Sequence, residues 1–71
     1  MKAEEFVVAF YDGATNKCFD EDRYAFEDFK EAYVYYDSYN KDTEKGDDYV
    51  KLYAYVNKTI GLILIGDFKM E

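Results

Sequence analysis

The stretch EFVVAFY, residues 5–11, is rich in the β-branched and aromatic residues that favour strands. Alternate side chains of a strand point to opposite faces, and both faces of this stretch are apolar. The two sets are Phe6, Val8 and Phe10 on one face, and Val7, Ala9 and Tyr11 on the other. Such a strand is typical of the centre of a sheet, or of a face that an oligomer partner covers. We therefore expect a central strand here.

A turn follows this strand. Asp12 and Gly13 form a strong turn signal, because both residue types adopt the backbone conformations that turns need. Residues 16–19 then fit a short return strand that would pair with the first.

A long helix is expected from about Glu21 to about Ser38. Asp20 is a candidate N-cap, and Glu21 and Asp22 place negative charge in the first turn, where the helix dipole favours it. Apolar residues then recur at helical spacing. The predicted buried stripe consists of Ala25, Phe29, Ala32, Tyr33 and Tyr36, with Phe26 at its margin. The stripe predicts that Tyr33 and Tyr36 lie in the core and that Tyr35 lies at the surface.

The second half of the chain predicts a polar loop at residues 40–48 and two further strands. Residues 49–56 alternate between an apolar face and a face of tyrosines with one lysine. The first face consists of Val50, Leu52, Ala54 and Val56, and the second of Tyr49, Lys51, Tyr53 and Tyr55. Asn57 and Lys58 fit a two-residue hairpin turn. Residues 59–65 are apolar on both faces, which predicts another central strand; residues 66–67 end it, and residues 68–71 form a tail.

These elements predict an α+β fold. One helix packed on a three- or four-stranded, mostly antiparallel sheet buries the apolar faces economically. Seventy-one residues suffice for a single domain, residues 1–71, and not for two cores. Because the chain has six phenylalanines and nine tyrosines, large rings are expected to fill much of the small core.

The cysteine and histidine content limits the chemistry. One cysteine, Cys18, cannot form an internal disulfide, and without histidine it cannot complete a structural zinc site. The first ten residues lack a signal-peptide pattern, and the longest apolar run, Ile60–Ile65, is too short to span a membrane. We expect a cytoplasmic protein with no cofactor.

Catalytic motifs are absent from the sequence. The usual general base for a serine or cysteine nucleophile is missing, and Cys18, near the expected helix start, has no evident catalytic partner. The glycines do not form a phosphate-binding loop. Residues 40–51 resemble a calcium loop in part, but Lys45 and Lys51 occupy the positions that require glycine and glutamate. We therefore expect a protein that is not an enzyme.

The net charge points to the kind of partner. Nine lysines and arginines against sixteen aspartates and glutamates give a charge of −7, which disfavours direct nucleic-acid binding and favours a basic protein partner. Two groups are candidates for protein binding, because tyrosine provides contact area and carboxylates select basic partners. The first consists of Tyr24, Asp28, Glu31 and Tyr35 on one helix flank, and the second of Tyr49, Tyr53 and Tyr55 on the sheet. Alternatively, these tyrosines could cover the sheet or seal a homodimer.

Two functions remain open from the sequence. The first is a non-enzymatic binding module, an inhibitor or adaptor whose acidic, tyrosine-rich surface docks on a basic site of another protein. In size and composition alone, the chain is similar to phage-encoded inhibitors that imitate the charge of nucleic acid and block nucleic-acid-handling enzymes. The alternative is a structural or assembly protein that self-associates through its aromatic sheet face.

Overall fold

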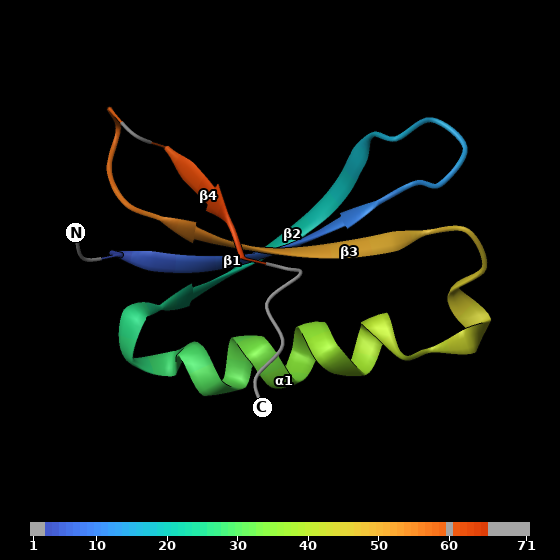
Figure 1. Cartoon of the computed structure of the whole chain (residues 1–71), viewed down its shortest axis with the longest axis horizontal. Helices are drawn as coiled ribbons and strands as arrows, with labels where there is room; N and C mark the ends of the chain where they lie inside the picture. Colours follow the sequence, from blue (N-terminus) through green and yellow to red (C-terminus); the bar gives the residue numbers. More distant parts are fainter. Residues whose placement is uncertain (1–2, 60, 66–71) are drawn as a thin grey trace.

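The computed structural model describes residues 3–59 and 61–65. Within them, one helix packs on a four-stranded antiparallel sheet of order β2-β1-β3-β4 (Figure 1). The strands are β1 (Glu5–Tyr11), β2 (Cys18–Ala25), β3 (Tyr49–Tyr55) and β4 (Leu62–Leu64); the helix is α1 (Phe29–Asn40), and two short 3-10 helices are η1 (Phe26–Asp28) and η2 (Thr43–Lys45). The predicted α+β fold is confirmed.

Strand β1 is central, as its two apolar faces predicted. It pairs with β2 along one edge and with β3 along the other, over its whole length. Val7 and Val8 point to opposite faces, and neither is exposed to solvent. Burial on both faces explains why the strand carries β-branched and aromatic residues without interruption.

The predicted start of the helix is wrong. Residues 18–25, most of which were expected to form the first helical turns, form strand β2, and α1 begins only at Phe29. Asp20 is therefore not the N-cap; Asp28 occupies that position. The backbone groups of β1 that face away from β3 need partners, and pairing with β2 supplies them. This requirement outweighs the low strand propensity of the acidic residues in β2.

The β1–β2 turn depends on Asp12 and Gly13. The Asp12 carboxylate accepts hydrogen bonds from the N–H groups of Ala14 and Thr15, at 2.7 and 3.0 Å. The Gly13 N–H donates to the Asp48 carboxylate at 3.0 Å. A Cβ on residue 13 would collide with the backbone carbonyl of Asp47, so only glycine fits between the two loops. The turn is confirmed, and the return strand is longer than the predicted residues 16–19.

The core lies between α1 and the adjacent sheet face. From the sheet, Phe6, Val8, Phe10, Val50 and Leu52 contribute, and from the helix the buried Ala32 and Tyr36. Phe29, Tyr33 and Tyr39 pack against them while partly exposed. The predicted stripe is thus confirmed from Phe29 to Tyr36, whereas Ala25 lies on β2.

Strand β3 has the predicted faces, but β4 differs from its prediction. The expected two-residue hairpin turn at Asn57–Lys58 is wrong: the Val56 N–H donates to the Gly61 carbonyl, and Gly61 supplies the positive φ, +75°. β4 is a short strand at the sheet edge and not a central one. The predicted strand end at residues 66–67 and the predicted tail at residues 68–71 lie outside the described residues.

Candidate functional site

The first candidate surface lies where α1 meets β2. Tyr24 and Tyr35 were predicted to share one flank of a single helix, but Tyr24 lies on β2 and Tyr35 on α1. Tyr24 pairs with Phe6 in the strand register, which directs its side chain toward the helix side of the sheet. The two rings nevertheless meet, with their centroids 6.5 Å apart and their planes at 58°. The residues are together as predicted, for a different structural reason.

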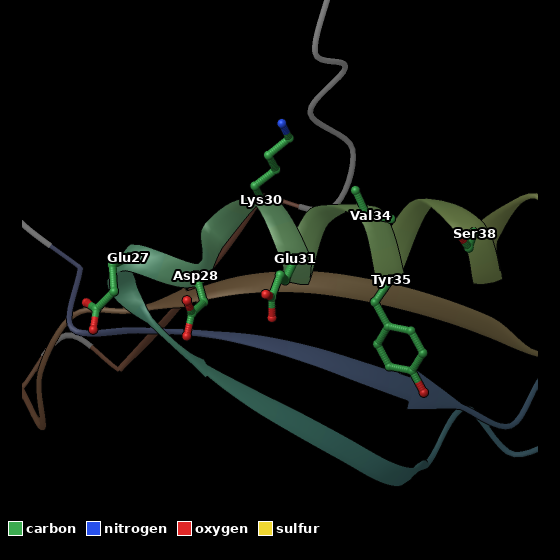
Figure 2. Close-up of a pocket in the computed structure, with 7 residues that line it drawn as sticks. All are labelled: Glu27, Asp28, Lys30, Glu31, Val34, Tyr35 and Ser38. Atoms are coloured by element: carbon green, nitrogen blue, oxygen red, sulfur yellow. The ribbon is translucent and has the colours of Figure 1, made fainter.

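Carboxylates gather beside these rings. Asp28, Glu31 and Tyr35 border an open hollow of about 590 Å³ on the helix surface, together with Glu27, Lys30, Val34 and Ser38. Figure 2 shows Asp28, Glu31 and Tyr35 directed to the same side of the helix, and Lys30 to the opposite side. Three of the predicted residues therefore border one hollow, whose exposed Val34 adds an apolar element.

Two further carboxylates, Asp20 and Asp22, were missed by the sequence analysis. They alternate with Tyr24 along β2 and pair with Phe10 and Val8, so all three side chains point to the helix side of the sheet. The spacing of residues 20, 22 and 24 is a strand signal that could have revealed this shared face. The same residues also resemble the capped start of a helix, and this competing pattern hides the strand signal in the sequence.

Tyr35 is fixed on one side and open on the other. Its ring makes an edge contact with Phe10, at 5.7 Å and 71°, while 42% of the residue stays exposed. Burial, followed by the charge of Asp22 and a hydrogen bond to it, raises the pKa of Tyr35. The hydroxyl therefore stays neutral at physiological pH and points into a negative environment.

Tyr24 is also close to the negative charge of Asp22. Its pKa is raised by burial first, and then by the charge of Asp22 and by Tyr35 and Glu31. We call this surface the acidic flank. It consists of Asp20, Asp22, Tyr24, Asp28, Glu31 and Tyr35.

The second candidate surface is the sheet face away from α1, and there the tyrosines largely contact one another. Tyr49 stacks on Tyr11, with ring centroids 5.0 Å apart and planes at 5°. The hydroxyls of Tyr11 and Tyr53 are 2.8 Å apart, and burial together with this hydrogen bond raises the pKa of Tyr11. Lys51 Nζ lies over both stacked rings, at 5.3 and 5.7 Å. Tyr11 was not among the predicted site residues, although its place opposite Tyr49 follows from the pairing of β1 with β3.

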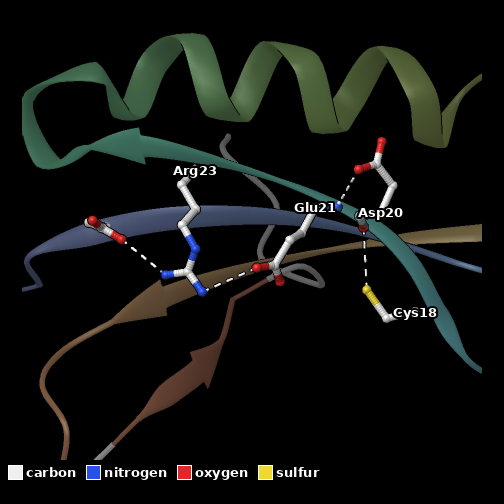
Figure 3. Close-up of polar contacts among 5 residues, drawn as sticks. Cys18, Asp20, Glu21 and Arg23 are labelled. Carbon is white, nitrogen blue, oxygen red and sulfur yellow. Dashed lines mark hydrogen bonds and ion pairs between the residues drawn. The ribbon is translucent and has the colours of Figure 1, made fainter.

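Charged side chains that form ion pairs occupy another part of this face. Arg23 bridges Glu5 and Glu21, with N–O distances of 3.1 and 3.2 Å (Figure 3). Tyr55, the third predicted tyrosine, pairs with Glu5 at the end of β3. The rings and charges of this face therefore pair largely among themselves, and Val7 and Ala9 on the same face are buried.

Cys18 occupies an exposed position in β2 and not the start of a helix. Its thiol donates to the Asp20 carbonyl at 3.3 Å (Figure 3). Within residues 3–59 and 61–65, no group of three or more cysteines, aspartates or glutamates is arranged to hold a metal ion. In the same residues, no helix has the length and apolar character needed to cross a membrane.

Comparison of the chain with protein-family models, with curated proteins and with solved structures gives no match.

Proposed function

We propose that this protein is a non-enzymatic binding module that docks its acidic flank on a basic surface of another protein. The observation that carries the proposal is that the aromatic rings of Tyr24 and Tyr35, which come from different elements, lie close together with carboxylates beside them. Neither α1 nor β2 alone carries both tyrosines. Partly exposed tyrosines provide contact area with little loss of side-chain entropy, and the carboxylates select a cationic partner.

Two features support docking on a folded surface. Tyr35 is held by Phe10, so the ring loses little freedom on binding. The hollow beside it gives a partner side chain a place to enter, and Asp28 and Glu31 at its border would pair with a lysine or arginine there.

The experiment is capture of partners from a cell lysate by the immobilised protein, compared with the Glu31→Lys variant. The matched control is Glu44→Lys, because Glu44 is also exposed but lies in η2, outside the acidic flank. Each reversal replaces one negative charge with one positive charge and changes the net charge from −7 to −5. We expect Glu31→Lys to lose a protein that Glu44→Lys retains. Equal capture by both variants would show that the acidic flank is not the binding surface.

A more specific form of this proposal is inhibition of a nucleic-acid-handling enzyme by imitation of nucleic-acid charge. The carboxylates of Asp20, Asp22 and Glu31 would then take the place of phosphates. Duplex DNA added during capture should release the partner in that case, since both compete for one basic groove. Capture that DNA leaves unchanged would restrict the proposal to an adaptor or inhibitor of another kind.

A further inference from the structure

The two edges of the sheet differ in how they are protected. The β2 edge carries consecutive charges at Asp20, Glu21, Asp22 and Arg23, which discourage pairing with another strand. The β4 edge consists of Leu62, Ile63 and Leu64, which are 44–45% exposed and uncharged. Among the described residues, no strand pairs with the outer edge of β4. An exposed apolar edge without charges is a template for strand addition.

The backbone hydrogen-bonding groups of β4 are oriented so that another strand could pair with its outer edge. The Ile65 N–H donates to the Leu52 carbonyl at 2.7 Å, and the Gly61 carbonyl accepts from Val56 at 3.1 Å, so residues 61 and 65 turn their backbone groups toward β3. Antiparallel ladders alternate in this respect. Leu62 and Leu64 therefore turn their N–H and C=O groups away from β3, toward the outer edge of β4.

We infer that β4 is a homodimer interface, in which the β4 strands of two copies pair antiparallel and join their sheets into one. A two-fold axis at Ile63 places Leu62 of one copy opposite Leu64 of the other, and each such pair exchanges both of its backbone hydrogen bonds. The two Ile63 side chains then meet on the helix side of the sheets, because Ile63 pairs with Ala54, and Ala54 with the core residue Phe6.

The β4 edge fits a second copy of the chain, because each copy brings the same uncharged, exposed strand and a two-fold axis matches the backbone groups of Leu62 with those of Leu64. Two chains of charge −7 repel one another, so self-association needs a contact that keeps the carboxylates apart. Pairing at β4 keeps the carboxylates of β2 in the two copies apart, because β2 lies at the opposite edge of the sheet (Figure 1). A basic partner would gain nothing at the uncharged leucines. The contact is short, so the dimer should be weak and concentration-dependent.

The hydrophobic side of the contact extends beyond the strand itself. An apolar groove of about 570 Å³, lined by Phe6, Phe26, Phe29, Ala54, Ile65 and Glu27, lies on the helix side of the sheet. Ala54 pairs with Ile63, so the contact between the two Ile63 side chains would lie next to this groove. Pairing would therefore extend an apolar surface that is already present.

The register is tested by disulfide cross-linking in a Cys18→Ser background, which removes the exposed native thiol. In a non-hydrogen-bonded antiparallel pair the Cα atoms are about 4.5 Å apart, within the range of about 4.4–6.8 Å that a disulfide spans. Ile63→Cys should therefore give a covalent dimer with oxidised glutathione. In Leu64→Cys the two cysteines are diagonal and not directly opposite one another, so this variant should cross-link several-fold more slowly. Val34→Cys, at an exposed position of α1, should cross-link only at the rate of random collision between molecules. Equal rates for all three variants would overturn the proposal.

Sedimentation velocity over a concentration series gives an independent readout. Leu64→Lys should abolish the dimer, because it adds a charge at the edge, whereas Val34→Lys makes the same kind of change elsewhere and should retain it. Circular dichroism checks that both variants fold. A monomer at every concentration, or a dimer that persists in Leu64→Lys, would contradict the inference. Glu31→Lys should dimerise like the unchanged protein, which separates this inference from the proposed acidic flank.

Discussion

Tyr35 joins the core to the surface. Its ring packs edge-on against Phe10 and lies beside Tyr24, while its hydroxyl lies in the field of Asp22 and Asp20. The helical spacing of residues 33–36 was enough to predict that Tyr36 is buried and Tyr35 is not. The contact with Asp22 was not predictable in the same way, because it requires a strand from a different part of the chain.

The pKa of Tyr35 tests this arrangement. Asp22→Asn removes a negative charge that disfavours the tyrosinate, so the pKa should fall toward its ordinary value of about 10. It should not reach that value, since burial is the larger cause. NMR titration of ring-labelled tyrosine measures the change. Asp37→Asn on the same helix is the control; a Tyr35 pKa that responds equally to both variants would contradict the contact.

Gly13 should not tolerate a side chain. Gly13→Ala forces the loop at Asp47 to move, which we expect to lower the free energy of unfolding by about 1–3 kcal/mol. Ala14→Ser, at the exposed neighbouring position, should change it by less than about 0.5 kcal/mol. Urea unfolding measures both. Similar values for the two variants would show that the close approach of the loops is not required.

At the scale of the elements, β2 is where sequence reasoning failed. Its residues have a good helix-start pattern and poor strand propensity, and local signals therefore favour the wrong structure. The choice is made by β1, which is buried on both faces and needs hydrogen-bonding partners along both edges. Strands β1 and β3 were predictable because their own alternation carries the signal, whereas β2 depends on its neighbour.

The packing of α1 on the sheet depends on a small residue. Ala32 lies on α1, and its side chain is fully buried against the core residues of β1 and β3. The larger side chain of Ala32→Leu therefore has no room there. We expect a loss of about 1–3 kcal/mol in the free energy of unfolding. Val34→Leu, on the exposed side of the same helix, should be nearly neutral in the same urea experiment. A neutral Ala32→Leu would mean that the helix does not pack closely on the sheet.

At the scale of the whole molecule, the packing of one helix on a sheet was predictable. The position of β4 in the sheet and the contact of β2 with α1 were not. Alternation and helical spacing identify which faces of β1, β3 and α1 are apolar, and burying those faces together gives one helix on a sheet. The edge position of β4 could not be deduced, since an apolar run looks the same in a central strand and in an edge strand. The acidic flank was partly predicted, because Asp28, Glu31 and Tyr35 share one helix, while Asp20 and Asp22 join it only through the tertiary fold.

Stability should fall in alkaline solution. The pKa values of Tyr11, Tyr24 and Tyr35 are raised in the fold, in each case chiefly by burial. Above about pH 10 the unfolded chain loses these protons first, so the unfolded state binds fewer protons and the free energy of unfolding decreases as pH rises. Below that pH the contribution is fully present. Urea unfolding between about pH 8 and pH 11 measures the slope, which Tyr11→Phe should reduce; a stability that is constant or rises over this range would contradict the assignment.

The most direct test of the acidic flank is the affinity for the captured partner at two salt concentrations. Isothermal titration of the unchanged protein, Glu31→Lys and Glu44→Lys compares one charge reversal at the flank with one outside it. We predict at least a tenfold weaker affinity for Glu31→Lys, about 1.4 kcal/mol, and little change for Glu44→Lys. The difference should shrink as salt rises, because exposed charges are screened over about 8–10 Å. Equal affinities for the two variants at low salt would contradict the proposal that the acidic flank binds the partner.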